Sequence, residues 1–193
     1  MVALGGSHLA GLETEQSDYD LNFFVADDCE YQRLVENWCV RIGGKDIHAY
    51  ICPLRAIEYS FTGFSTGLIK QSQMKRQDII WYNSRYQHFI DTYFDLLPQL
   101  AMIGMLRYKE CLGNNQPWKN AYSYMLGANW LLDANYDLDK IKYYKANYNK
   151  LTPSEQDYYY GIINDISRKL DQTGGDWKEL WKPIYELLRK TLC

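Results

Sequence analysis

The hydrophobic pattern of this chain changes once, near Pro53. Before that residue, short runs of strand-forming residues alternate with Gly-Gly turns and one segment of helical spacing. After it, apolar residues recur every three or four positions, as they do on the buried face of an amphipathic helix. Strands followed by helices are typical of an α+β protein. The sequence therefore predicts an α+β fold, a small mixed β-sheet followed by an α-helical bundle.

Residues 1–53 are expected to form a compact α/β core. The expected strands are residues 1–4, 19–26 and 45–51, which are rich in β-forming residues or alternate polar with apolar ones. Between them the sequence predicts one helical turn at 7–12 and a helix at 29–40, which Gly43-Gly44 would end. Strand, turn, strand, helix and strand thus follow one another within this core.

The rest of the chain is expected to be helical. Residues 54–84 are assigned to a connecting region with one or two helices, and residues 85–193 to a helical C-terminal domain. The expected helices of that domain are residues 85–111, 118–133, 138–148, 153–170 and 177–192. Glycine, proline and threonine residues separate these segments.

Composition excludes several classes of protein. The net charge is −3 with a pI near 5.6, so the chain lacks the strongly basic footprint of a broad duplex-binding protein. No apolar run approaches the roughly 20 residues that span a bilayer, and no signal peptide is visible. The five cysteines have no zinc-like spacing and are expected to be free thiols. These features predict a cytoplasmic protein without a membrane partner.

Two short motifs near the N-terminus fit each other chemically. Gly5-Gly6-Ser7 follows the first expected strand, where exposed N–H groups and the Ser7 hydroxyl suit phosphate oxygens. Asp18 and Asp20 lie two residues apart on an expected strand, so their carboxylates share one face about 7 Å apart. Two adjacent carboxylates favour a hard cation such as Mg²⁺, which also binds phosphate oxygens. A phosphate cradle beside a divalent-cation site is what a nucleoside triphosphate requires.

The same residues carry a family resemblance. Residues 6–20 read GS-x-x-x-G-x-x-T-x-x-S-D-x-D, with Gly11, Thr14 and Ser17 between the two motifs. This stretch resembles the signature of the DNA polymerase β-like nucleotidyltransferase superfamily, and most closely its small bacterial and phage branch. The match is contiguous and specific, whereas the helical half resembles the family's partner domain only generically.

The resemblance implies a role for each matching residue. Gly6 and Ser7, with Ser17 nearby, would bind the nucleotide through its β- and γ-phosphates. Asp18 and Asp20 would be catalytic and would ligate Mg²⁺. The family's third acidic residue lies on the next strand of the sheet, where Asp46 would complete a second metal site and help to deprotonate the attacking hydroxyl. Asp28 and Glu58 are the alternatives for this third acid.

The implied reaction is a two-metal, in-line displacement in which a nucleoside monophosphate passes from ATP or another NTP to a hydroxyl, with release of pyrophosphate. Two Mg²⁺ ions are expected, with Mn²⁺ as the alternative. The acceptor stays open among small molecules, RNA ends and proteins. The helix that usually precedes the first motif strand has no counterpart before Gly6, which leaves a reduced form or a homodimer as alternatives.

Other polar residues have a structural and a functional interpretation. Lys70, Lys75 and Arg76 either supply counter-charges for a triphosphate or form a solvated face. Residues 140–150 mix lysines with tyrosines, which fits an amphipathic helix or a surface for single-stranded nucleic acid. His8 lacks an acidic partner for a Ser-His pair. A packed or hydrogen-bonded role is expected for His48, with contact to substrate as the alternative.

A second functional class remains open. A member of this superfamily that had lost catalysis would bind an NTP or a partner protein, for example as the antitoxin-like half of a regulatory pair. Retention of Asp18 and Asp20 favours the enzyme.

Overall fold

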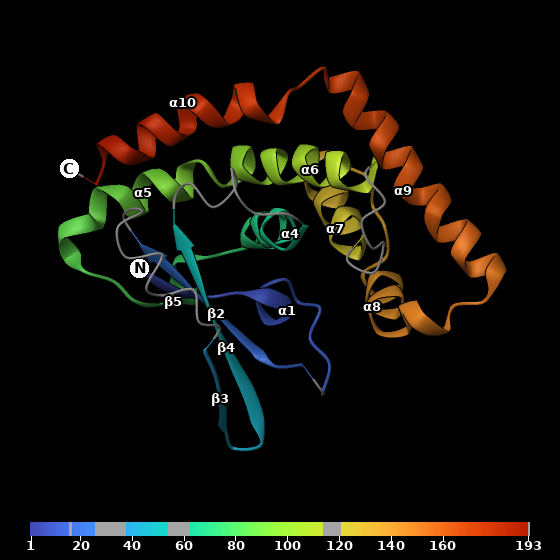
Figure 1. The fold of residues 1–193 in the computed structure, drawn as a ribbon, viewed down its shortest axis with the longest axis horizontal. Coiled ribbons are helices and arrows are strands. Elements are labelled where there is room, and N and C mark those ends of the chain that lie inside the picture. Colours follow the sequence, from blue (N-terminus) through green and yellow to red (C-terminus); the bar gives the residue numbers. More distant parts are fainter. Residues whose placement is uncertain (16, 26–37, 54–61, 114–120, 193) are drawn as a thin grey trace.

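The computed structural model describes residues 1–15, 17–25, 38–53, 62–113 and 121–192. Figure 1 shows the N-terminal sheet in the lower half of the molecule, with helices above it and two long helices along the top and the right. The α+β expectation is confirmed at this level: an N-terminal mixed sheet with helices is followed by a C-terminal helical region.

Five strands form a single mixed sheet in the order β3-β4-β2-β1-β5. The strands are β1 (Val2–Leu4), β2 (Tyr19–Val25), β3 (Trp38–Ile42), β4 (Lys45–Pro53) and β5 (Ile79–Trp81). The central strands β2 and β4 run parallel, and the other neighbours are antiparallel. The three strands expected from the sequence are confirmed in β1, β2 and β4, whereas β3 and β5 were not expected.

Strand β3 corrects the helix expected at residues 29–40. From Trp38 onward the chain is extended and pairs with β4, while residues 29–37 lie outside the described part. The cause is the Gly43-Gly44 pair, which has φ values of 60° and 81°. Two consecutive positive φ values are the requirement of a type I′ hairpin turn. The two glycines therefore join two strands and do not end a helix.

Strand β5 corrects the expectation that residues 54–84 contain helices only. Helix α4 (Thr62–Gln71) is present, but Ile79–Trp81 pair with β1 at the edge of the sheet. The Ile-Ile-Trp run is too short for a helix and consists of strand formers. The sheet therefore includes residues beyond Pro53.

The helices after the sheet largely follow the expected segments. They are α5 (Gln87–Asp95), α6 (Leu97–Gly113), α7 (Tyr122–Leu131), α8 (Leu138–Asn147), α9 (Pro153–Thr173) and α10 (Trp177–Lys190), with short 3₁₀ turns at Arg76–Asp78, Ser84–Tyr86 and Tyr148–Lys150. The single helix expected at 85–111 is wrong, because the chain breaks at Leu96. Pro98, in the first turn of α6, explains the break, since proline is favoured in the first turn of a helix and disfavoured in its interior.

The sheet and the helices share one hydrophobic core. A single cluster of buried side chains extends from Ala3 in β1 to Leu188 in α10. Phe24 of β2 contacts Tyr93 of α5 edge-on, with 5.1 Å between ring centroids. Side chains alternate along a strand, so Asp20 and Asn22 lie on the same, helix-facing side of β2 as Phe24. The Asp20 side chain therefore lies on the side of the sheet that faces the helical region.

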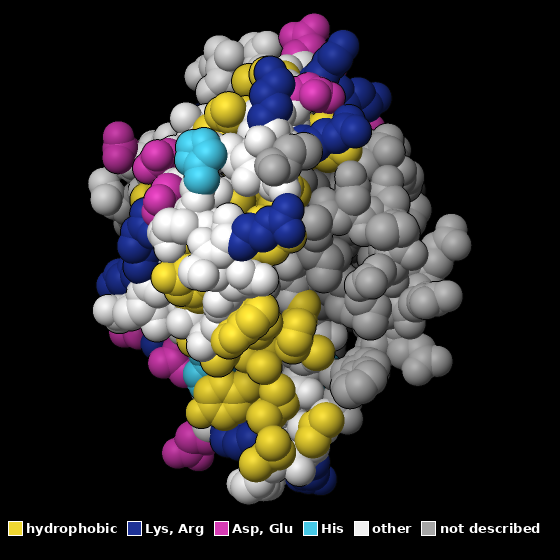
Figure 2. Space-filling view, turned by 90° about the vertical axis from the view of Figure 1, so that its left-hand side faces the viewer, with side chains coloured by type: hydrophobic (Ala, Val, Ile, Leu, Met, Phe, Trp, Pro, Cys, Tyr) yellow, Lys and Arg dark blue, Asp and Glu magenta, His cyan; other side chains and the backbone are white. Residues whose placement is uncertain are grey.

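The surface combines charged and apolar areas. Figure 2 shows hydrophobic side chains gathered in the lower half of the face that lies on the left of Figure 1. Ile80, Trp81 and Tyr82 at the end of β5 are among the most exposed large hydrophobic residues that the structure describes. Every helix in the described ranges is too short or too polar to span a bilayer.

Two glycines in helices allow a matched test of how closely the helices contact one another. A Cβ on Gly127 of α7 would lie 2.4 Å from Sδ of Met105 and 2.9 Å from Cγ2 of Ile69, whereas a Cβ on Gly161 of α9 meets nothing within 4 Å. We expect Gly127→Ala to lower the free energy of unfolding by about 1–3 kcal/mol through overpacking. Gly161→Ala is expected to raise it by about 0.5–1 kcal/mol, because alanine favours helices. Urea denaturation measures both, and equal effects would refute close contact at α7.

Buried tyrosines predict the response of the protein to alkaline pH. Burial raises the pKa of Tyr108, Tyr124 and Tyr159 above the ordinary tyrosine value. These phenols stay neutral in the folded state but ionise in the unfolded chain above about pH 10. Stability is therefore expected to fall as the pH rises past 10. Absorbance of tyrosinate at 295 nm should show a second, cooperative rise that coincides with unfolding by circular dichroism; independent titration of all tyrosines would contradict it.

Candidate functional site

The site is built on the Gly5-Gly6 turn that joins β1 to α1 (Gly6–Leu9). The Gly5 N–H donates to the carbonyl of Asp20 at 2.7 Å, which ties the turn to the start of β2. Gly6 has φ of 61°, and a Cβ there would lie only 1.5 Å from Oδ2 of Asp20. A Cβ on Gly5 would lie 2.4 Å from the side-chain nitrogen Nδ2 of Asn22. Gly6 thus lets the Asp20 carboxylate approach the backbone, and Gly5 leaves room for the Asn22 side chain.

Ser7 follows this turn and meets a lysine from the helical region. The Lys145 ammonium of α8 donates to Ser7 Oγ at 2.7 Å and to the Leu12 carbonyl at 2.7 Å. Ser7 is buried in the first turn of α1. The first N–H groups of a helix have no acceptor within the helix. A hydroxyl, an ammonium and free backbone donors therefore converge beside the Asp20 carboxylate, a combination that suits phosphate oxygens.

The electrostatic balance around Lys145 includes charges of both signs. Burial lowers the pKa of the Lys145 ammonium, and the charge of nearby Lys70 acts in the same direction. Tyr122 and the carboxylates of Asp18 and Asp20 oppose this shift. Lys70 itself lies over the Tyr122 ring, 5.3 Å from its centroid. The Lys145 ammonium, which donates to Ser7, thus lies within electrostatic range of Lys70, Asp18 and Asp20.

Asp18 is close to His48 of the neighbouring strand. His48 Nε2 lies 3.3 Å from Asp18 Oδ2, and both side chains are partly exposed. The parallel register places Asp20 opposite His48 across β2 and β4. The hydrogen-bonded role expected for His48 agrees with this contact. The histidine thus contacts the Asp18 carboxylate from the strand next to β2.

Asp46 is on the same strand but has a different partner. Its carboxylate pairs with Arg41 of β3 at 3.6 Å, and the two side chains are 48% and 73% exposed. In the ranges that the structure describes, no three His, Cys, Asp or Glu side chains are grouped closely enough to hold a metal ion. The structure therefore brings Asp18 and Asp20 to the Ser7 region but leaves Asp46 with Arg41. The alternatives Asp28 and Glu58 lie outside the described residues.

Ser17 and His8 have local structural partners. The Ser17 hydroxyl accepts from the Thr14 N–H at 2.8 Å, and the Ser17 N–H donates to the Thr14 carbonyl at 2.9 Å. Ser17 thus closes the loop that precedes Asp18. The ring of His8 stacks on Tyr19 at 4.2 Å between centroids and does not form a Ser-His pair in the described contacts.

The cations considered from the sequence are separated by the fold. Lys70 joins the Ser7 region, whereas Arg76 pairs with Asp91 at 2.7 Å and lies over the Phe94 ring. Lys75 is exposed beside the 3₁₀ turn. Lys145 belongs to the lysine- and tyrosine-rich segment 140–150, and its sequence context did not distinguish it from the other lysines there. Its helical spacing beside buried Ile141 and Tyr144 was the available signal for an inward-facing lysine.

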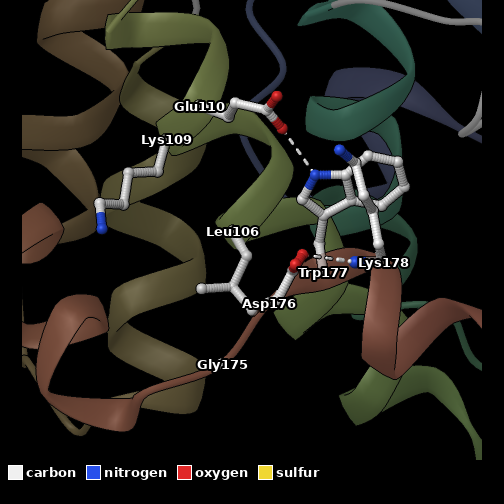
Figure 3. Close-up of a pocket in the computed structure, with 7 residues that line it drawn as sticks. All are labelled: Leu106, Lys109, Glu110, Gly175, Asp176, Trp177 and Lys178. Atoms are coloured by element: carbon white, nitrogen blue, oxygen red, sulfur yellow. Dashed lines mark hydrogen bonds between the residues drawn. The ribbon is translucent and has the colours of Figure 1, made fainter.

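A pocket elsewhere in the helical region shares no residue with this site. It has a volume of about 390 Å³ and lies between α6 and the start of α10. Figure 3 shows the Glu110 carboxylate accepting from the Trp177 indole N–H, a hydrogen bond of 2.6 Å. Arg107 also bonds this carboxylate at 2.8 Å and lies over the Trp177 ring. These contacts attach α10 to α6.

Two glycines with similar backbone angles separate strain from crowding at the site. Gly6 and Gly11 have φ of 61° and 65°, but a Cβ on Gly11 meets nothing within 4 Å. We expect Gly11→Ala to cost about 1–2 kcal/mol of unfolding free energy, the ordinary cost of a left-handed alanine. Gly6→Ala should cost more, because the Asp20 carboxylate has to move. Urea denaturation of both variants tests this, and equal losses would rule out the close approach.

Comparison of the chain with protein-family models, with curated proteins and with solved structures found no match. A function for the chain is therefore inferred from its residues and their contacts. Within the described residues, the group that best suggests a chemical function is the one at the Gly5-Gly6 turn. It consists of Gly6, Ser7, Asp18, Asp20 and Lys145.

Proposed function

We propose that this chain is a nucleotidyltransferase of the polymerase β-like type, which transfers a nucleoside monophosphate from an NTP to a hydroxyl acceptor and releases pyrophosphate. The observation that carries the proposal is the convergence of Ser7, Lys145 and the Asp20 carboxylate at one turn. The resemblance of residues 6–20 to the family signature supports the same assignment.

The phosphate side of the site has its donors in place. Ser7 Oγ and the first-turn N–H groups of α1 would bind the β- and γ-phosphates, with Gly6 allowing close approach. Lys145 and Lys70 would neutralise part of the triphosphate charge. Lys145 already holds Ser7 through its ammonium group, so both side chains are oriented before the substrate binds. Such preorganisation lowers the cost of ordering on binding.

The donor set of Asp18 and Asp20 fits one Mg²⁺ ion, because proteins bind this ion through one or two carboxylates while substrate phosphates and water supply the other ligands. Bound there, the ion would neutralise charge on the phosphates and the leaving pyrophosphate. Mn²⁺ has the same preference for oxygen ligands. The close packing of the Asp20 carboxylate against Gly6 would fix its position, and His48 would orient Asp18.

Asp46 would complete a second metal site only after leaving Arg41. An exposed ion pair of this kind contributes about 0–1 kcal/mol, so its loss costs little. The two residues lie opposite each other in the β3–β4 hairpin, and Asp46 comes two residues before His48 on β4. We propose that the acceptor hydroxyl approaches from this hairpin side, where Asp46 would help to take its proton.

A regulatory, NTP-binding protein is the second candidate. The observation in its favour is that the described carboxylates and histidines include no group of three that could hold a metal ion. Such a protein would keep the phosphate contacts of Ser7 and Lys145 without turnover. Binding and catalysis therefore have to be measured separately.

The test is pyrophosphate release with Mg²⁺ or Mn²⁺, each labelled NTP in turn, and hydroxyl acceptors of the three open classes. We expect Asp20→Asn to reduce the rate by about 100-fold or more, because an amide lacks the charge that holds the cation. Lys145→Met should raise KM for the NTP by about 10-fold, since a hydrogen bond to a charged group contributes roughly 1.5–3 kcal/mol. Asp157→Asn, an exposed change in α9, serves as the control.

Two results decide between the candidates. Turnover that disappears in Asp20→Asn but persists in Asp157→Asn supports the enzyme. Tight NTP binding without pyrophosphate release for any acceptor supports the regulatory protein. Absence of both binding and turnover would refute the site itself.

A further inference from the structure

The loop between α1 and β2 carries the second half of the motif but has little regular structure. Within it, the Thr14–Ser17 turn is closed by the hydrogen bonds of Ser17 with Thr14. Asp18 follows directly, one residue before β2 begins at Tyr19. The position of the Asp18 carboxylate therefore depends on what holds this loop against the sheet.

One lysine from another element contacts the loop at this point. The Lys45 ammonium donates to the carbonyl of Glu15 and lies 3.4 Å from the carbonyl of Ser17. Ser17 is buried, and Lys45 itself is partly buried. The contact joins residues 30 positions apart and uses main-chain acceptors, so it does not depend on a flexible partner side chain.

The hairpin fixes where Lys45 stands. It is the first residue of β4, directly after the Gly43-Gly44 turn, and it pairs with Ile42 across the hairpin. The backbone ladder between β2 and β4 begins at Tyr19 and Ile47. Ser17 lies two residues before Tyr19, and Lys45 lies two residues before Ile47. These two residues are connected by the lysine side chain and not by the backbone. The Lys45 side chain thus connects β4 to the chain just before β2, beyond the last backbone pair of the two strands. Asp18 lies between this contact and that pair.

We propose that Lys45 is a positioning residue, which clamps the loop before Asp18 and so sets the place of that carboxylate beside His48. The role rests on the proposed nucleotidyltransferase function, in which Asp18 binds the cation. Lys145 holds the start of the same loop through the Leu12 carbonyl, and Lys45 holds its end. The two ammonium groups differ in purpose: Lys145 lies among the phosphate donors, whereas the contacts of Lys45 are to carbonyl groups of the loop.

The clamp predicts a specific kinetic signature. Lys45→Met removes the donor but keeps the length of the side chain. We expect kcat to fall by about 10-fold, because small displacements of a catalytic group have large effects on rate. KM for the NTP should change by less than about 2-fold, since Ser7 and Lys145 are untouched. Lys45→Arg keeps a donor for both carbonyls and should restore most of kcat. Lys182→Met in α10, an exposed lysine, is the control.

Hydrogen exchange of the nucleotide-free protein gives a readout that needs no activity. Amides of residues 11–18 should exchange about 10-fold faster in Lys45→Met, with peptides from α9 unchanged and with the rate restored in Lys45→Arg. Lys45→Gln provides a second variant if Lys45→Met fails to fold. Exchange and kcat equal to those of Lys182→Met would overturn the proposal, and so would a loss of kcat without faster exchange in the loop. If the wild-type protein shows no nucleotidyl transfer, exchange alone decides: faster exchange retains the clamp while the proposed function falls, and unchanged exchange overturns the clamp.

Discussion

The close approach of the Gly5-Gly6 turn to β2 is the constraint on which the site depends. A side chain at Gly6 would collide with the Asp20 carboxylate, and one at Gly5 would force the Asn22 side chain to shift, so the turn favours glycine at both positions. This turn brings the end of β1, the first turn of α1 and the start of β2 into contact within a few residues. A carboxylate on a strand and a hydroxyl on a helix become neighbours as a result. Every proposed role of Ser7 and Asp20 follows from that contact.

Lys145 connects the turn to the helical region. Burying an ammonium group is costly, and the lowered pKa of Lys145 reflects this cost. The hydrogen bonds to Ser7 and Leu12 and the nearby carboxylates offset part of it. The Lys145 ammonium lies near the Ser7 hydroxyl and within electrostatic range of Asp18 and Asp20. Such an arrangement suits an anionic substrate that binds together with a metal cation. The helical region thus contributes directly to the site, and it shares a hydrophobic core with the sheet.

The sequence predicted the broad fold because strand and helix periodicities are local signals. It failed at β3 and β5 for different reasons. Gly43-Gly44 is compatible with a helix end and with a hairpin, and only the pairing partner β4 distinguishes them. Ile79–Trp81 is too short to show a period, and its strand form depends on pairing with β1. The break at Leu96 was foreseeable from Pro98, because proline favours the first turn of a new helix over the interior of a longer one.

By itself, the sequence determined the local chemistry of this protein: glycines for a tight turn, a serine beside it, and two carboxylates two residues apart at the start of a strand. These features depend on residues close together in the chain. Only the tertiary structure decided which distant residues join them. Lys145 lies 138 positions from Ser7, Lys45 lies 30 positions from Glu15, and Asp46 pairs with Arg41 through a hairpin. Contacts between distant segments depend on how strands align and helices dock, which no local pattern of residues specifies.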